Sequence, residues 1–304
     1  MNLIIGKGQA TIHGGTLTRA ENPLNCGNSG TTVRLMMGLL AGQRISAEFI
    51  GDQSLSSRPM GRVTEPLTKL GAKFELVENG LPVKLLSNAL CGINHTLEVP
   101  SAQVKSALIL AALGAKGSSV ITDPFNTRNH TENLLFSMGA DILVKDYDVH
   151  IQPLKRSLKS IEWEVPADPS SVAFFVAAVL AVKNSRVEFK NVLINPTRVG
   201  FLNVLKQSGA KFKRLRPRLE YGEEICDLIV ESSYLKGISI NKSVVPSLVD
   251  EIPVLAVLAT QMYGRTIVRG AKELRVKECD RLEAIVKNLR GLGVSVNEFS
   301  DGLK

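Results

Sequence analysis

The sequence predicts a mixed α/β (α+β) fold of two domains, built from repeated β-α-β-α-β-β units with buried helices under sheets. Three repeated features support this prediction. Four segments join the Leu-rich end of a helix to a glycine and then to a strand: 66–74, 133–142, 203–212 and 287–296. An arginine precedes each of these helices: Arg58, Arg128, Arg198 and Arg281. Upstream of each arginine lies a second helix that is apolar on nearly all faces, which indicates a buried helix.

One glycine follows each Leu-rich helix, at positions Gly71, Gly139, Gly209 and Gly293. Glycine takes the left-handed backbone conformation without steric cost, so each of these glycines predicts the C-terminal cap of a helix. The four caps in the same relative place indicate an internal repeat rather than a chance similarity of amphipathic helices.

The four apolar helices each have a polar start, and they are predicted at 28–40, 101–113, 168–180 and 247–259. Polar helix starts collected at one end of the repeats gather free N–H groups and helix dipoles, which predicts an anion-binding site. A polar stretch near residues 164–168 suggests a boundary between domains 1–165 and 166–304, with two repeats in each and the anion site between them.

The composition narrows the class of partner. The chain of 304 residues carries a formal charge of +8, but only 5% of its residues are aromatic, so a base-stacking surface for nucleic acid is not expected. Small anionic substrates are favoured. The four cysteines show no CxxC spacing, which predicts neither a metal site nor disulfides and fits a reducing cytoplasm. The longest apolar run, 172–182, is too short to cross a membrane.

The segment 274–281 reads Leu-Arg-Val-Lys-Glu-Cys-Asp-Arg and stands where a loop turns into a helix. If that helix begins near Val276, then Lys277, Glu278 and Arg281 share one face. Two cations beside one carboxylate suit a phosphate or carboxylate ligand, with Glu278 placed to pass a proton. The alternative is a solvated first turn whose charges pair along the helix.

Several motifs in order resemble one known family. They are Leu-Asn-Cys-Gly-Asn-Ser-Gly-Thr-Thr-Val-Arg at 24–34, Arg-Val-Lys-Glu-Cys-Asp-Arg at 275–281, and the segments 51–62, 99–106, 127–132 and 247–253 between them. Together they resemble the 5-enolpyruvylshikimate-3-phosphate (EPSP) synthases, and in particular their bacterial class II branch, over essentially the whole chain. The resemblance implies the two-domain enolpyruvyl transferase fold.

The resemblance also implies an activity. Members of the family are transferases of the shikimate pathway, which leads to chorismate and the aromatic amino acids. They add the 5-hydroxyl of shikimate 3-phosphate to phosphoenolpyruvate and then eliminate phosphate. No metal or cofactor is implied, and we expect a cytoplasmic monomer. Glyphosate, which mimics phosphoenolpyruvate, is the family's inhibitor.

The family motifs carry residue roles onto this chain. Asp250 is implied as the catalytic base and Glu278 as the proton donor. The implied contacts of shikimate 3-phosphate are Ser101, Ala102, Gln103, Arg128, Asp250 and Lys277. The implied contacts of phosphoenolpyruvate are Asn28, Gly30, Thr31, Arg58, Gln103 and Arg281. The plainer interpretations are a helix-start acid for Asp250 and a turn glycine for Gly30, while Arg34 and Asp168 are expected to be structural, Asp168 as an N-cap.

Two features set the chain apart from the family pattern. The family has six repeats, whereas four are recognisable here, and two terminal motifs are absent: Pro-Gly-Asp-Lys-Ser and Asp-His-Arg. We therefore expect a chain short by about one repeat at each end, with poor turnover. Two other functions stay open, namely an enolpyruvyl transferase acting on UDP-N-acetylglucosamine and a non-catalytic remnant that binds anions.

Overall fold

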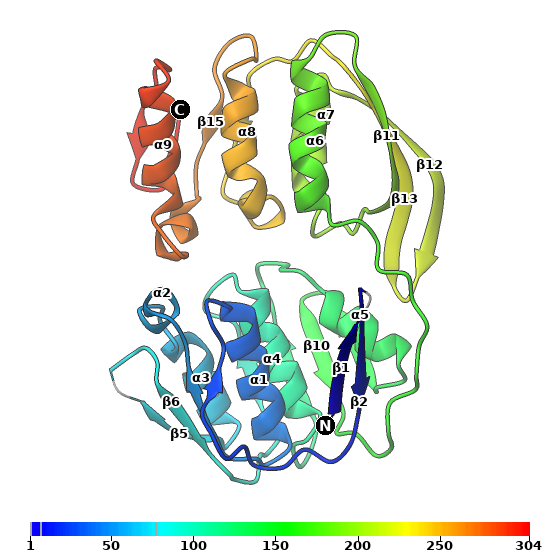
Figure 1. Cartoon of the computed structure of the whole chain (residues 1–304), viewed down its shortest axis with the longest axis vertical. Coiled ribbons are helices and arrows are strands. Elements are labelled where there is room, and N and C mark those ends of the chain that lie inside the picture. Colours follow the sequence, from blue (N-terminus) through cyan, green and yellow to red (C-terminus); the bar gives the residue numbers. More distant parts are fainter. Residues whose placement is uncertain (1, 7, 77) are drawn as a thin grey trace. The chain divides into compact units, whose positions relative to one another are not determined.

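One strand order, repeated along the chain, organises the fold (Figure 1). The computed structural model describes all residues except 1, 7 and 77. The chain divides into unit 1, which comprises Met1–Thr122 and Asp141–Ser157, and unit 2, which comprises Asp123–Ala140 and Leu158–Lys304. These bounds differ from 1–165 and 166–304 because residues 123–140 and 158–165 group with unit 2. The assignment of two repeats to each domain stays a prediction.

The first repeat forms a four-stranded sheet in unit 1. Its elements are β3 (Leu24–Asn25), α1 (Gly30–Gly42), β4 (Ala47–Ile50), α2 (Gln53–Ser56), α3 (Gly61–Lys69), β5 (Lys73–Leu76) and β6 (Val83–Leu86). The strand order is β3-β4-β6-β5, with β3 parallel to β4 and the other neighbours antiparallel. This is the predicted β-α-β-α-β-β unit with the short helix α2 added before α3.

The second repeat has the same strand order. Its elements are β7 (Asn94–Thr96), α4 (Ala102–Ala112), β8 (Ser119–Thr122), α5 (His130–Ser137), β9 (Ile142–Lys145) and β10 (Asp148–Ile151). The sheet runs β7-β8-β10-β9, again with its first two strands parallel. A separate hairpin of β1 (Asn2–Gly6) and β2 (Gln9–His13) precedes both repeats.

Unit 2 contains the third and fourth repeats. The third has α6 (Pro169–Ala181), β11 (Arg186–Leu193), α7 (Gly200–Gln207), β12 (Lys211–Glu220) and β13 (Glu223–Glu231), in the order β11-β13-β12. Its first strand is reduced to one parallel bridge between Ala167 and Val192. The predicted mixed fold is confirmed by these repeats.

The fourth repeat forms the sheet β14-β15-β17-β16. Its elements are β14 (Ser239–Ile240), the 3-10 turns η1 (Val245–Ser247) and η2 (Val249–Glu251), α8 (Ile252–Ala259), β15 (Ile267–Val268), the 3-10 turn η3 (Lys272–Val276), α9 (Arg281–Gly291), β16 (Glu298–Phe299) and β17 (Gly302–Leu303). In Figure 1, α6, α8 and α9 lie side by side.

The predicted glycine caps are confirmed. The backbone φ angle is 108° at Gly71, 88° at Gly139, 105° at Gly209 and 81° at Gly293. Each glycine follows the C-cap residue of α3, α5, α7 or α9. A side chain at these positions would be strained, which explains why the repeat uses glycine there.

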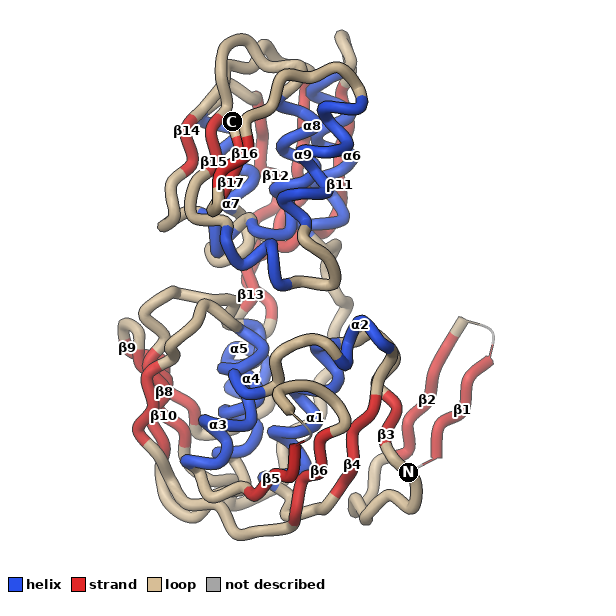
Figure 2. Tube along the Cα trace, turned by 90° about the vertical axis from the view of Figure 1, so that its left-hand side faces the viewer, coloured by secondary structure: helices blue, strands red, loops and turns tan. Residues whose placement is uncertain are grey.

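The apolar helices α1 and α4 lie in the core of unit 1. Figure 2 shows α1, α3 and α4 between the sheet that contains β3 to β6 and the sheet that contains β8 to β10. A Cβ atom built on Gly38 of α1 would stand 2.1 Å from the carbonyl oxygen of Ala107 in α4. The two helix backbones therefore approach so closely that only glycine fits at position 38.

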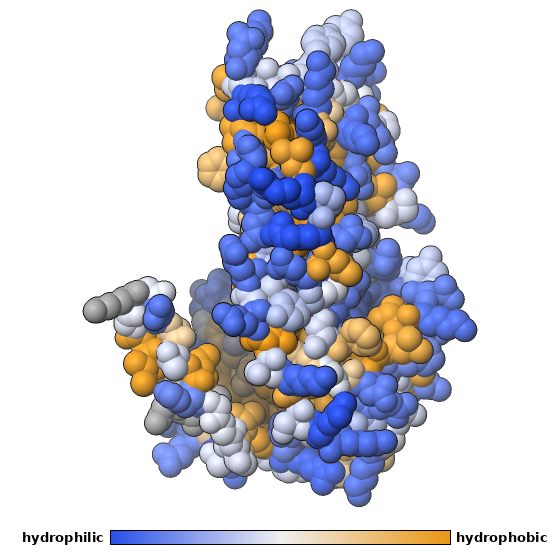
Figure 3. Space-filling view, turned by 90° about the vertical axis from the view of Figure 1, so that its right-hand side faces the viewer, coloured by the Kyte–Doolittle hydropathy of each residue, from blue (hydrophilic) through white to orange (hydrophobic). Residues whose placement is uncertain are grey.

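The apolar helices α6 and α8 are buried on one face only, although their sequences are apolar on nearly all faces. Phe174 and Phe175 in α6 are 61% and 65% exposed, and Val257 in α8 is 59% exposed. Each of these helices packs one face on the core of unit 2 and leaves another face open. Exposed apolar side chains are visible among polar ones in the space-filling view (Figure 3). Among the described helices, none is long and apolar enough to span a bilayer.

Candidate active site

Two helix starts carry predicted site residues in unit 1. Ser29 caps α1 and accepts a hydrogen bond from the backbone N–H of Thr32 at 3.1 Å. Ser101 caps α4 and accepts one from the N–H of Val104 at 3.4 Å, so Ala102 is the first residue of that helix. The sequence forms helices here because the serine hydroxyls satisfy backbone N–H groups that have no partner within the helix.

Gln103 joins these two helix starts. Its Nε2 donates to Oγ1 of Thr31 at 2.8 Å, and its Oε1 accepts from Nη1 of Arg34 at 2.5 Å. In the same unit, Nη2 of Arg58 donates to Oδ1 of Asn28. The structure thus pairs predicted site residues that lie far apart in sequence: Thr31 with Gln103, and Asn28 with Arg58.

Gly30 lies directly under two guanidinium groups. A Cβ atom added to this glycine would stand 2.8 Å from Nη1 of Arg34 and 3.3 Å from Nη1 of Arg58. Its φ angle is not positive, so a larger residue here would be opposed by the two side chains rather than by the backbone conformation. Two cations and two helix starts around a side-chain-free position make a place where an anion can approach the backbone closely.

Arg34, which is expected to be structural, lies beside Gly30 and contacts the predicted site residue Gln103. It is only 8% exposed, and it donates a hydrogen bond to the side-chain amide oxygen of Gln103. The sequence spacing indicates this position, because Arg34 follows Gly30 by one helical turn and therefore lies on the same face of α1.

A second group of predicted residues lies in unit 2 and centres on Asp250. Arg128 donates to Oδ2 of Asp250, and Arg281 donates to Oδ1 of Asp250 from Nη1 at 3.1 Å. Arg281 also donates two hydrogen bonds to the carboxylate of Glu278, from Nε at 2.6 Å and from Nη2 at 3.0 Å. One guanidinium therefore connects the two carboxylates to which the resemblance assigns catalytic roles.

Burial and charge act in opposite directions on Asp250. Burial raises the pKa of its carboxyl group, but the charges and hydrogen bonds of Arg128 and Arg281 outweigh burial and hold that pKa below its ordinary value. Asp250 is therefore held in its ionised form by the two guanidinium groups.

The predicted helix start near Val276 is wrong. Residues Lys272–Val276 form a 3-10 turn, and α9 begins at Arg281 after Asp280, whose carboxylate accepts from the N–H of Glu283 at 3.0 Å. Lys277 therefore does not share a helix face with Arg281, and its Nζ lies 3.9 Å from Oε1 of Glu273. Likewise Asp250 lies in the 3-10 turn η2, two residues before the first residue of α8, rather than in an α-helix.

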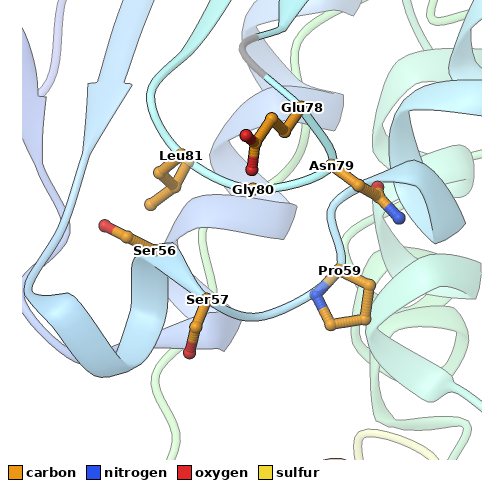
Figure 4. Close-up of a pocket in the computed structure, with 7 residues that line it drawn as sticks. All are labelled: Ser56, Ser57, Pro59, Glu78, Asn79, Gly80 and Leu81. Atoms are coloured by element: carbon orange, nitrogen blue, oxygen red, sulfur yellow. The ribbon is translucent and has the colours of Figure 1, made fainter.

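Two cavities lie away from these groups. One, of about 420 Å³, flanks the loop that carries Arg58 and is lined by Ser56, Ser57, Pro59, Glu78, Asn79, Gly80 and Leu81 (Figure 4). The other, of about 430 Å³, lies in unit 2 between α7, β14 and η1. Neither cavity is lined by a residue predicted to bind substrate.

Among the described residues, no group of three or more His, Cys, Asp or Glu side chains is placed to hold a metal ion.

Comparison with known proteins identifies the family. Residues 5–304 match the family described as EPSP synthase (3-phosphoshikimate 1-carboxyvinyltransferase). A protein of Persephonella marina with the name 3-phosphoshikimate 1-carboxyvinyltransferase is 46% identical over 312 residues, which cover 100% of this chain and 72% of that protein.

Solved structures agree with the sequence match. The EPSP synthase from Acinetobacter baumannii has a TM-score of 0.85 at 36% identity, and the match covers 99% of this chain and 69% of that chain. The enolpyruvyl transferase NikO from Streptomyces tendae has a TM-score of 0.58 at 16% identity over 77% of this chain and 55% of that chain, and so it shows a common fold alone. The family resemblance in the sequence is confirmed, and the chain belongs to the EPSP synthase family.

Proposed function

We propose that this chain transfers the enolpyruvyl group of phosphoenolpyruvate to the 5-hydroxyl of shikimate 3-phosphate and releases phosphate. The observation that carries the proposal is the family match over residues 5–304, together with relatives named for this reaction. The geometry of the two residue groups is compatible with it, because both present guanidinium groups beside helix starts, as a pair of polyanionic substrates requires.

For phosphoenolpyruvate, we propose contacts with the group around Gly30. Arg58 has a buried Nε atom without a hydrogen-bond partner among the described residues, which an anionic ligand oxygen would satisfy. Asn28 and Thr31 flank the same position, and Arg281 of unit 2 is proposed as the second guanidinium. A planar fork of N–H donors binds carboxylate and phosphate more specifically than lysine does.

For shikimate 3-phosphate, we propose contacts with the start of α4 and with the Asp250 group. Ser101, Ala102 and Gln103 offer hydroxyl, backbone N–H and amide groups. Arg128 and Lys277 are proposed to add positive charge. Arg128 uses one N–H group for Asp250 and has further donors for a phosphate oxygen, so an anion that shares this guanidinium would weaken its hold on Asp250 and raise the basicity of that carboxylate in this proposal.

Two carboxylates are proposed to move protons. Asp250 takes the proton from the 5-hydroxyl as its oxygen attacks C2 of phosphoenolpyruvate, and Glu278 delivers a proton to C3, which becomes a methyl group. The tetrahedral intermediate then loses a proton from C3 as the bond between C2 and the phosphate oxygen breaks. The products are the enol ether and phosphate, and the steps use no metal or cofactor.

The test is the formation of product by the purified chain. It is incubated with both substrates, and the enolpyruvyl product is identified by mass spectrometry after long incubation, which detects slow turnover. Shikimate 3-phosphate is omitted in one control and replaced by UDP-N-acetylglucosamine in another. Product with shikimate 3-phosphate alone supports the proposal. A folded chain that makes no product, or that makes product from the UDP-sugar instead, contradicts it.

We further propose that the active chain is a cytoplasmic monomer. Light scattering coupled to size-exclusion chromatography tests the oligomeric state, because a monomer would elute with the mass of one 32.9 kDa chain. A mass of two chains or more that persists on dilution would contradict this proposal.

A further inference from the structure

Glu251 is a buried carboxylic acid that the proposed mechanism does not use. It follows Asp250 directly in the 3-10 turn η2, and it is 2% exposed. Its Oε1 accepts a hydrogen bond from Oγ of Ser170 at the start of α6. Among the described residues, Ser170 is its side-chain hydrogen-bond partner, and no cation forms an ion pair with it. Burial of a charged carboxylate without a cation costs free energy, whereas burial of the neutral carboxylic acid costs much less.

Ser170 connects Glu251 to an arginine. Its Oγ accepts from Nη2 of Arg198 at 2.8 Å, and the same Nη2 donates to Oδ1 of Asp168 at 2.6 Å. The Arg198 side chain is only 10% exposed. The hydrogen bonds therefore run in one direction, from Arg198 through Ser170 to Glu251, and fix the orientation of the Glu251 carboxyl group.

Arg198 also reaches the segment that carries Arg128. Its Nη1 lies 3.5 Å from Nε2 of His130, whose Nδ1 lies 2.8 Å from Oε1 of the buried Glu223. The two ring nitrogens of His130 therefore contact Glu223 on one side and Arg198 on the other. Arg198 thus connects the segments that hold the two members of the Arg128–Asp250 pair, because His130 follows Arg128 by two residues.

The electrostatic surroundings favour the neutral form of Glu251. Burial raises the pKa of its carboxyl group, and the nearby charge of Asp250 raises it further, whereas the hydrogen bond from Ser170 and the charges of Arg198 and Arg128 only partly oppose this. The charged or polar groups of the packed elements are Asp168 at the N-cap of α6, Ser170 in α6, Arg198 before α7, Arg128 before α5, and Asp250 in η2 itself. The remaining neighbour, α8, contains no charged residue.

We propose that Glu251 is a positioning residue that, as a neutral carboxylic acid, anchors η2 to the Arg198–Ser170 chain and so holds Asp250 against Arg128 and Arg281. This proposal rests on the proposed function, because the roles of Asp250 and the two arginines come from it. The neutral form matters for binding. A second carboxylate charge beside Asp250 would compete for the same guanidinium groups and repel the anionic substrates.

The kinetic test compares three variants with the wild-type chain. Glu251→Ala removes the anchor and should lower kcat by up to roughly 10²-fold, the scale expected for a misplaced catalytic group. Glu251→Gln keeps the shape, the neutral charge and an oxygen that accepts from Ser170, so it should restore most of that loss. Glu164→Gln is the matched control, because Glu164 is exposed and its carboxylate has no side-chain bond among the described residues.

A pH series separates positioning from a purely structural role. As the pH rises through the folded pKa of Glu251, the wild type gains a repelling charge, so its kcat/KM should fall relative to Glu251→Gln. The ratio of the two enzymes cancels the ionisation of the substrates. A ratio that stays constant across the pH range, or a Glu251→Gln chain as impaired as Glu251→Ala, contradicts the proposal.

Two further measurements cover the remaining outcomes. If Glu251→Ala does not fold, Ser170→Ala removes the hydrogen-bond donor while Glu251 stays in place. This variant should also lower kcat with little change in KM, and an unchanged kcat contradicts the proposal.

Infrared spectroscopy tests the protonation of Glu251 without an activity assay. The carbonyl band of a protonated carboxylic acid should be present in the wild type and absent from Glu251→Gln. An unchanged spectrum contradicts the neutral acid. Absence of product in the wild type contradicts the proposed function instead.

Discussion

Arg128 donates a hydrogen bond to the carboxylate of Asp250 across 122 residues of sequence. The two side chains are 30% and 33% exposed, so the pair is partly shielded from water and is screened less than a surface ion pair. Arg281 binds the other oxygen of the same carboxylate. An anion that bound either guanidinium would share it with Asp250, and we propose that this links substrate binding to the basicity of the proposed base.

Replacement of the proposed base should reduce turnover much more than binding. Asp250→Asn keeps the side-chain shape but cannot take the proton, so kcat should fall by roughly 10² to 10⁴. KM should change little or decrease, because Arg128 and Arg281 lose a competing carboxylate. Asp250→Ala should lose as much in kcat. Steady-state kinetics checks this, and near-normal kcat in Asp250→Asn would remove Asp250 from the mechanism.

Gly30→Ala should weaken binding at the proposed phosphoenolpyruvate position. The new methyl group would stand 2.8 Å from Nη1 of Arg34, and the flexible end of that side chain can shift, so the fold should be retained. We expect a higher KM for phosphoenolpyruvate and a larger loss of inhibition by the longer glyphosate molecule. Gly14→Ala is the control, since its Cβ would meet nothing within 4 Å. Equal inhibition of the wild type and Gly30→Ala by glyphosate would show that Gly30 does not determine sensitivity to this inhibitor.

Gly38→Ala tests the close approach of α1 and α4. The added Cβ would lie 2.1 Å from the carbonyl oxygen of Ala107, a rigid backbone atom, so the helices must separate. Overpacking of this kind costs roughly 1–3 kcal/mol, although alanine regains up to about 1 kcal/mol in helix propensity. The midpoint of unfolding in urea should fall. Gly291→Ala, in open space at the end of α9, should not lower it. An unchanged midpoint for Gly38→Ala would contradict the close helix contact.

Asp227 should make the free energy of unfolding of unit 2 decrease as the pH falls in the acid range. Its carboxylate accepts from the backbone N–H of Asn191 and from Arg216, and these bonds lower its pKa to about 2 from an ordinary value of 3.8. A lowered folded pKa means that the stabilisation is present above the unfolded pKa and is lost as the pH falls towards 2. These bonds also fix β-bulges in β11 and β12.

The variant Asp227→Asn should therefore be less stable than the wild type at neutral pH. The two unfolding midpoints should converge as the pH falls from about 4 to about 2. Denaturant unfolding at a series of pH values measures this, with Asp141→Asn, at an exposed aspartate of unit 1, as the control. A difference that stays constant down to about pH 2 would show that Asp227 is not the titrating group.

Local sequence signals predicted the repeat well. Glycine caps such as Gly71 and the N-caps Ser101 and Asp168 depend on a single residue and its immediate backbone, so their positions could be predicted from the sequence. The start of α9 could not, because the charged run before it forms a 3-10 turn and Asp280 caps the helix instead. Propensity alone does not separate a 3-10 turn from the first turn of an α-helix.

The site residues were predicted as a set, but their mutual contacts were not. Motif similarity assigned Arg128, Asp250 and Arg281 to one function, whereas no local pattern shows that one carboxylate lies between two guanidinium groups. The contacts of Arg34 and Glu251 could not be predicted for the same reason. Their partners, Gln103 and Ser170, are 69 and 81 residues away, so only the folded chain shows the contacts.

The proposed addition and elimination can be tested most directly by running the reaction in D₂O. Addition turns C3 of phosphoenolpyruvate into a methyl group with a proton from an exchangeable acid, and elimination then removes one of its three hydrogens. The account predicts that the enolpyruvyl product formed by this chain carries deuterium at C3, detected by mass spectrometry and NMR, and that Glu278→Gln slows its appearance. An enolpyruvyl product with no deuterium at C3 would contradict the account.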